Sequence, residues 1–254
     1  MNATQCRWRP APPLAPPLAD DDLHLWRATL DMPADELPRW ARLLSPDEHE
    51  RARRFHFEKD AHRFVARRAA LRIMLARYTG TAPAALQFRY GAQGRPELAG
   101  APDTPAVSFN LSDSKHVALY AFTRSRAVGV DIEYLRPLTD LDRVAARILT
   151  PREYARLAAL PAGSRRAAFF AAWSLKEAYL KAVGQGLIGL PRVEVAIAPD
   201  TPALLTIAAS EDAARAWFVH PCASQEGFAA AAVVHGGACH ISHFDFTFEG
   251  QQPR

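Results

Sequence analysis

Long hydrophobic runs are missing from this 254-residue sequence. Its most apolar segment, residues 227–234, is much shorter than the roughly 20 residues that cross a bilayer as a helix. The N-terminus also lacks the apolar run that a secretory signal contains. These absences argue against a membrane protein and a secreted one, and they make residues 227–234 a candidate for a buried strand.

Cysteine is scarce as well, with three residues, Cys6, Cys222 and Cys239. Their spacing matches no zinc motif, and an odd number of cysteines does not form a complete set of disulfides. We therefore expect reduced thiols in a cytoplasmic protein.

Charge of one sign is not in large excess, because 31 Lys and Arg stand against 27 Asp and Glu. A formal net charge of +4 does not select a class of partner. The distribution is more informative, since eight arginines and one lysine lie between Arg51 and Arg77 against two acids. An anionic ligand explains this cluster, and so does a solvated basic face. Nucleic acid is one such ligand, but no helix-turn-helix, RNA-recognition or zinc pattern accompanies the charge.

Composition indicates a globular protein, with 49% hydrophobic and 23% charged residues. The order of predicted elements also repeats. A strand, a long helix and several strands occur over residues 23–123, and much the same occurs over residues 127–234. We therefore expect an α/β (α+β) fold of two similar halves. The predicted parts are a flexible Pro/Ala-rich segment at 1–19, an N-terminal half at 20–126, a C-terminal half at 127–248 and a loose tail at 249–254.

The first motif with chemical content is Val-Gly-Val-Asp-Ile-Glu at residues 128–133, which predicts a strand because it is apolar and β-branched. Asp131 and Glu133 are two residues apart, so their carboxylates project from the same face. Such a pair is costly unless a cation lies between its members, and Mg²⁺ is the natural candidate because it prefers oxygen ligands. A solvated strand edge would produce the same pattern.

The second motif is Trp-Ser-Leu-Lys-Glu-Ala-Tyr-Leu-Lys at residues 173–181, which predicts a helix. Trp173, Glu177 and Lys181 are each four residues apart and therefore lie on one face. Glu177 could be a third carboxylate for the cation, and Lys181 could contact a phosphate. Taken alone, two residues of this kind are more often an ordinary ion pair on a helix surface.

Together and in this order, the two motifs resemble the signature of the 4′-phosphopantetheinyl transferase superfamily, in its longer, surfactin-synthetase-activating (Sfp) type. That signature is a Gly-x-Asp-x-Glu strand followed by a Trp-x-x-Lys-Glu-x-x-x-Lys helix, and both are intact at residues 129–133 and 173–181. The resemblance covers roughly residues 23–234. It implies a monomer of two α/β halves related by a pseudo-twofold axis, with the active site in the cleft between them.

The resemblance implies an enzyme that moves the 4′-phosphopantetheine arm of coenzyme A to a serine of an apo acyl or peptidyl carrier protein. Adenosine 3′,5′-bisphosphate would be the second product, and polyketide or nonribosomal peptide biosynthesis the usual setting. Asp131, Glu133 and Glu177 would hold Mg²⁺, and Lys181 would stabilise the pyrophosphate. Glu177 or Glu133 would accept the serine proton, and the sequence leaves that choice open. We expect no nucleic-acid or membrane partner.

The resemblance also implies contacts with the coenzyme A phosphates. Their candidates are Arg51, Arg63, Arg95, Ser112 and Lys181. Arg68 falls on the apolar stripe of its predicted helix, so a buried ion pair is as plausible there as a ligand contact.

One residue departs from the family pattern. Asp113 stands where relatives carry a histidine that binds a coenzyme A phosphate, and an acid at this place would repel the phosphate. Asp113 could turn away while Ser112 and backbone N–H groups bind the phosphate. Alternatively, Lys115 or His116 supplies the charge, or the affinity for coenzyme A is weaker.

Three further interpretations remain open at this stage. Glu153 lies where the family has another glutamate near the metal, but with Thr150 it also forms a capping-box pattern. We assign Trp173 and Lys176 mainly to packing and support of the site. The remaining alternative functions are another Mg²⁺-dependent nucleotide or phosphate enzyme and a basic nucleic-acid-binding module.

Overall fold

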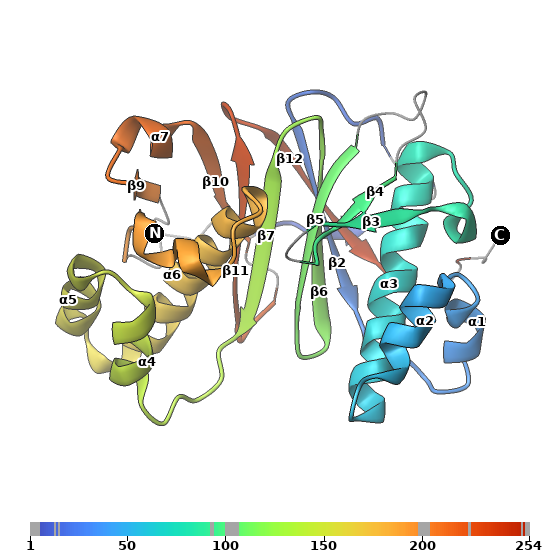
Figure 1. The fold of residues 1–254 in the computed structure, drawn as a ribbon, viewed down its shortest axis with the longest axis horizontal. Coiled ribbons are helices and arrows are strands. Elements are labelled where there is room, and N and C mark those ends of the chain that lie inside the picture. The colour runs from blue at the N-terminus through green and yellow to red at the C-terminus, as the bar shows by residue number, and fades with distance from the viewer. Residues whose placement is uncertain are drawn as a thin grey trace.

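The computed structural model describes residues 6–12, 14, 16–91, 94–99, 107–197, 204–222, 225–249 and 251. Two sheets stand side by side in the middle of the molecule, and helices lie at both flanks (Figure 1). Within the described residues, no helix is both long and apolar enough to cross a membrane. Parts of the expected flexible segment and loose tail, at 1–5, 13, 15, 250 and 252–254, lie outside the description.

The first sheet has the strand order β1-β12-β2-β6-β5. Its three longest strands are β2 (Asp22–Thr29) at the centre, β6 (Val117–Arg124) beside it and β5 (Val107–Ser114) at the edge. The long helix α3 (Glu58–Thr79) buries its apolar stripe in the same hydrophobic core as these strands. The shorter elements are α1 (Leu37–Ala41), α2 (Pro46–Arg53), the 3₁₀ turn η1 (Pro83–Ala85) and the hairpin of β3 (Phe88–Tyr90) and β4 (Pro96–Leu98).

The long helix expected in the N-terminal half is present as α3, and the separate helix α2 precedes it. Ser45 and Glu48 form a capping box at the start of α2, where Pro46 occupies the first turn. The helix α3 ends at Gly80, whose φ of 71° lies in the left-handed region that glycine adopts without strain.

The second sheet has three antiparallel strands in the order β10-β11-β7. They are β7 (Val128–Tyr134), β10 (Trp217–Pro221) and β11 (Phe228–His235), and the last contains most of the apolar run seen in the sequence. The helix α6 (Ala162–Ala182) covers this sheet. The shorter elements are α4 (Leu141–Ile148), α5 (Pro151–Ala159), α7 (Glu211–Arg215), the 3₁₀ segment η2 (Leu187–Arg192) and the paired strands β8 (Val193–Val195) and β9 (Leu204–Ile207).

The two halves share one topology. In each half, the first strand is followed by a long helix and then by an antiparallel pair, and the last strand of that pair lies beside the first strand. The resulting orders are β2-β6-β5 and β7-β11-β10. The chain is therefore a mixed α/β protein in which the same arrangement of elements occurs twice.

One strand of the expected C-terminal half lies in the other sheet. β12 (His240–Phe246) runs parallel to β2 on one side and to the two-residue strand β1 (Arg9–Pro10) on the other. The sequence alternation of β12 predicts a strand, but it carries no information about the partner. Residues 9–10, which lie in the segment expected to be flexible, thus pair with the end of the chain.

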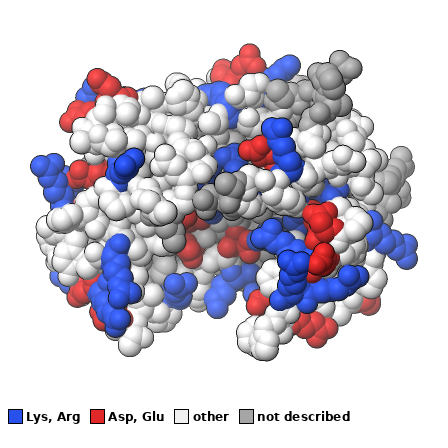
Figure 2. Space-filling view, viewed as in Figure 1, with Lys and Arg blue, Asp and Glu red and all other residues white. Residues whose placement is uncertain are grey.

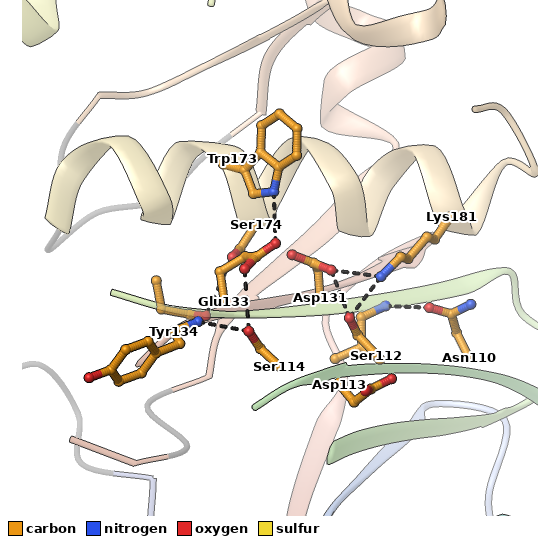
Figure 3. Close-up of polar contacts among 12 residues, drawn as sticks. Asn110, Ser112, Asp113, Ser114, Asp131, Glu133, Tyr134, Trp173, Ser174 and Lys181 are labelled. Carbon is orange, nitrogen blue, oxygen red and sulfur yellow. Dashed lines mark hydrogen bonds and ion pairs between the residues drawn. The ribbon is translucent and has the colours of Figure 1, made fainter. Parts of the chain in front are cut away.

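The halves meet where β5 and β7 lie side by side without a shared backbone ladder. Side chains at alternate positions of β5 make the link instead (Figure 3). Asn110 Oδ1 accepts the Val130 N–H at 2.9 Å, and Ser114 Oγ accepts the Tyr134 N–H at 3.1 Å. Because successive side chains of a strand point to opposite faces, Asn110, Ser112 and Ser114 all face β7.

The helix α6 lies directly on β7 at Gly129. A Cβ built on Gly129 would stand 1.9 Å from the carbonyl oxygen of Ala178 and 2.7 Å from the amide nitrogen of Ala182. Real side chains do not make contacts this short, so the motif glycine permits the close approach. This approach brings the acidic face of β7 beside the Glu177–Lys181 face of α6.

Candidate active site

Three carboxylates lie together at the boundary between the halves. Asp131 and Glu133 point from β7 towards α6 (Figure 3), which supplies Glu177. Burial, followed by repulsion from Asp131, raises the pKa of both Glu133 and Glu177 above the ordinary carboxyl value. Among the described residues, Asp131 Oδ2 and Glu177 Oε1 are buried and have no hydrogen-bond partner. Two of the three carboxylates thus keep an oxygen available for a ligand.

Lys181 is the cation that belongs to this cluster. Its Nζ lies 2.6 Å from Asp131 Oδ1 and 2.8 Å from Ser112 Oγ, and the Ser112 hydroxyl donates to the same Asp131 oxygen at 2.8 Å. One ammonium and three ionised carboxylates leave a net charge of −2. A divalent cation with oxygen ligands would neutralise that charge and use the two unpartnered oxygens, so the residues present fit Mg²⁺.

Glu133 is held in place by neighbours from both sides. Trp173 Nε1 donates to its Oε1 at 3.2 Å, and Ser114 Oγ donates to its Oε2 at 3.4 Å. The predicted supporting role of Trp173 therefore has a physical basis, since the indole orients a carboxylate of the cluster. The contribution of Ser114 was not predicted from the sequence, because a serine in a polar strand end has no distinctive pattern.

Lys176 and Glu153 form a fully buried ion pair in the core of the second half, with Nζ 2.6 Å from Oε2. The Glu153 carboxylate also accepts the Thr150 N–H at 2.6 Å and the Val195 N–H at 2.7 Å. The capping-box interpretation of Glu153 is thereby confirmed. Its carboxylate is committed to these partners and has no exposed surface.

A cleft of about 360 Å³ adjoins the carboxylate cluster. Glu177 and Lys181 line it on the side of α6, and arginines line it on the side of the first half. Figure 2 shows blue side chains gathered beside red ones around the hollow in the middle of this face. The basic lining residues are Arg51, Arg67, Arg68, Arg95 and Lys181. An elongated anion with several phosphates suits such a cleft.

The predicted phosphate ligands occupy different surroundings. Arg51 lines the cleft, with its guanidinium 5.6 Å from the Phe64 ring centre. Arg95 also lines the cleft, but it donates to the carbonyl of Lys181 at 2.6 Å and thereby connects the two halves. Arg63 pairs with Asp31 at 2.7 Å and lines a neighbouring hollow instead. A role in phosphate binding remains a prediction for each of them.

The departure at Asp113 has a local explanation, because its carboxylate forms an ion pair with Arg67. Arg67 lines both the cleft and the neighbouring hollow. The sequence did not distinguish it from the other arginines between Arg51 and Arg77. Arg68 forms a buried ion pair with Glu48, which also binds Arg72 at 2.7 Å. Of the two interpretations of Arg68, the structure therefore shows the buried ion pair.

Comparison with known proteins agrees with this geometry. The model of the 4′-phosphopantetheinyl transferase superfamily matches residues 127–233, and the model of the N-terminal part of 4′-phosphopantetheinyl transferases matches residues 26–124. The first match contains β7 and α6, which carry the three carboxylates. The second contains α3 and β5, which face them.

Individual relatives match over most of this region. The 4′-phosphopantetheinyl transferase HetI of a Nostoc species is 43% identical over 204 residues, which are 80% of this chain and 86% of that protein. The 4′-phosphopantetheinyl transferase Sfp of Bacillus subtilis is 31% identical over 60% of this chain and 66% of its own length. A similar protein from Xenopus laevis, an L-aminoadipate-semialdehyde dehydrogenase-phosphopantetheinyl transferase, is 29% identical over 63% of this chain and 56% of its own length.

Proposed function

The chain belongs to the 4′-phosphopantetheinyl transferase superfamily, in its two-domain Sfp type, and is an enzyme of that class; we propose how its cleft performs the transfer. In this proposal the cleft binds coenzyme A. The 4′-phosphopantetheine arm passes to a serine of an apo acyl or peptidyl carrier protein, and adenosine 3′,5′-bisphosphate leaves. The observation that carries the proposal is the cluster of three carboxylates and one lysine beside a basic cleft.

The carboxylates of Asp131, Glu133 and Glu177 would hold Mg²⁺. The unpartnered oxygens of Asp131 and Glu177 and the mutual repulsion of the three carboxylates support this assignment. When bound, the ion supplies positive charge that offsets the charge of the pyrophosphate and of the departing phosphate.

Positive side chains of both halves would hold the phosphates of coenzyme A. Lys181 lies at the acidic side of the cleft, where its ammonium can bind oxygens of the pyrophosphate. Arg51 lies across the cleft on α2. The ion pair with Arg67 supports the first explanation of Asp113, in which its carboxylate turns away from the ligand. Ser112 is already bonded to Asp131 and Lys181, so its place in the proposal is to position them.

Glu177 is the better candidate for the general base. It lines the cleft and has an unpartnered oxygen, whereas both oxygens of Glu133 accept hydrogen bonds. As the serine oxygen forms its bond to phosphorus, its proton would pass to Glu177. The bond from phosphorus to the oxygen of adenosine 3′,5′-bisphosphate breaks as the new bond forms.

The proposal also covers properties of the whole molecule. The cleft takes residues from both halves of one chain, which supports a monomer. The matching strand orders support a pseudo-twofold axis between the halves. A cytoplasmic location remains an expectation from the sequence.

The test uses an apo carrier protein, coenzyme A and Mg²⁺, with the carrier weighed by intact mass spectrometry. We expect the carrier to gain one phosphopantetheine, and we expect the gain to disappear with EDTA or with Glu177→Gln. Glu211→Gln is the matched control, because Glu211 lies on exposed α7 and pairs only with Arg215 in the described contacts. Full transfer by the folded Glu177→Gln variant would contradict the role of Glu177.

A further inference from the structure

A second cluster of chemically active side chains lies outside the cleft. Cys6 from the N-terminal segment, His220 from β10 and His243 from β12 place their ligand atoms within 4.8 Å of one another. The His220 and His243 Nε2 atoms are 3.0 Å apart, and Cys6 Sγ is 3.7 Å from His220 Nε2. All three side chains are partly buried. Three separate segments thus direct two imidazole nitrogens and one sulfur at a common point.

Two of the three donor separations are close to those around a tetrahedral zinc ion. Zinc binds histidine nitrogen at about 2.0–2.1 Å and cysteine sulfur at about 2.3 Å, which places two nitrogens about 3.3 Å apart and a nitrogen and a sulfur about 3.6 Å apart. The observed 3.0 and 3.7 Å differ from these values by a few tenths of an ångström. A small side-chain adjustment would therefore complete the geometry.

The chemistry of the donors selects the class of ion. Thiolate and imidazole favour zinc and related transition metals, whereas Mg²⁺ favours carboxylates. Arg9 is the charged neighbour of His243, and its guanidinium lies over the Phe244 ring and donates to Ser242. The positive charge of Arg9 disfavours a bound cation, and the negative charge of the Cys6 thiolate offsets this effect.

We propose that Cys6, His220 and His243 bind one Zn²⁺ ion, with the fourth position taken by water. A hollow beside His243, lined also by Arg7 and Arg9, gives solvent access to that side. On binding, the Cys6 thiol releases its proton to solvent. Each imidazole coordinates through Nε2 and carries its proton on Nδ1, so the hydrogen bond between the two rings is replaced by two bonds to the metal.

The location of the site suggests its role. His220 lies in the second sheet and His243 in the first, while Cys6 precedes β1 at the edge of the first sheet. Between the sheets lies a core that includes Leu25, Val130 and Ala232, with Trp8 packed against it. A metal bound here would fasten the N-terminal segment across both sheets, and it would do so independently of the carboxylate cluster.

The full-length protein, freed of metal with a chelator and then dialysed, is titrated with Co²⁺ as a spectroscopic substitute for Zn²⁺. Excess Mg²⁺ is present to occupy carboxylate sites. We expect one equivalent of Co²⁺ to produce a thiolate-to-cobalt charge-transfer band and the intense visible bands of four-coordinate cobalt. One equivalent of Zn²⁺ should then remove both.

Two variants and a matched control assign the ligands. Cys6→Ser should abolish the charge-transfer band, and His243→Gln should lower the Zn²⁺ affinity by more than about tenfold. Cys239→Ser should leave the band unchanged, because Cys239 interacts with Arg126 rather than with this cluster. Circular dichroism verifies that each variant is folded. Absence of the band in the wild-type protein, or its persistence in Cys6→Ser, would overturn the proposal.

A second measurement tests the structural role. Zn²⁺ at one equivalent should raise the thermal unfolding midpoint of the wild-type protein and of Cys239→Ser, because it binds the folded chain. The same addition should have no effect on Cys6→Ser. An equal rise in all three proteins would show that Zn²⁺ acts elsewhere and would contradict the proposed site.

Discussion

Replacing Gly129 with alanine should damage both stability and catalysis. The added Cβ would stand 1.9 Å from the carbonyl oxygen of Ala178, whereas ordinary contact begins at 3.4 Å. β7 and α6 would therefore have to separate by about 1.5 Å at this point. The obstructing atoms belong to the helix backbone, so a change of side-chain rotamer cannot relieve the contact.

The size of the effect follows from two opposing contributions. Overpacking against backbone costs about 3 kcal/mol, at the upper end of its usual range. Alanine restricts the unfolded chain more than glycine does, which returns about 1 kcal/mol. The net loss of unfolding free energy is therefore about 2 kcal/mol. With a urea slope of about 3 kcal/mol/M, the unfolding midpoint should fall by about 0.7 M.

The catalytic effect arises from the same displacement. Asp131 and Glu133 lie on β7, and Glu177 and Lys181 lie on α6, so separating these elements spreads the cluster. A misplacement of about 1 Å can reduce a rate about a hundredfold. Transfer to a carrier protein, followed by intact mass under conditions where Gly129→Ala is folded, should show a loss of this order.

Gly163→Ala is the matched control for this experiment. Gly163 lies in the first turn of the same helix, and a Cβ added there meets no atom within 4 Å. Alanine should be neutral or stabilise the helix by up to about 1 kcal/mol. If Gly129→Ala unfolds at the wild-type urea concentration and transfers at the wild-type rate, β7 and α6 do not approach as closely as described.

Two further predictions concern buried charge. Lys176→Met should lower the unfolding free energy by about 3–5 kcal/mol, because it leaves the Glu153 carboxylate buried without its cation. Chemical denaturation should show that adding Glu153→Gln to this variant recovers part of the loss, and a double variant less stable than the single one would contradict the explanation. In EDTA, the free energy of unfolding should fall as pH rises from 4.5, the ordinary carboxyl pKa, to the raised pKa of Glu133 and Glu177. The reason is that the folded state binds the protons of these two carboxyls more tightly than the unfolded state does. Mg²⁺ should therefore raise the melting temperature more at neutral pH than at a pH of about 5, and an equal rise at both values would exclude these carboxylates as its ligands.

Much of the site could be predicted because it lies in two local patterns. A period of two on the strand places Asp131 and Glu133 on one face, and a spacing of four on the helix aligns Glu177 with Lys181. Both relations depend only on backbone geometry within one element, so no tertiary information was needed. The capping residues of α2 and α5 were visible in the sequence for the same reason.

Contacts between distant segments could not be predicted from spacing within one element. Arg67 was one arginine among many until the fold placed it against Asp113, and Asn110 and Ser114 had no pattern that linked them to β7. Arg63 is the opposite case. The sequence made it a candidate phosphate ligand, but in the structure its guanidinium forms an ion pair with Asp31. Which partner a charged side chain meets depends on how the elements pack.

The amino-acid sequence by itself determined the long helices, the acidic strand and the helix face beside it, because those features follow from spacing along the chain. Only the tertiary structure decided that β12 crosses to the first sheet and that Cys6 meets two histidines more than 200 residues away. The physical reason is that pairing and packing of remote segments are set by the whole core, whereas a local repeat is set by the backbone of a single element.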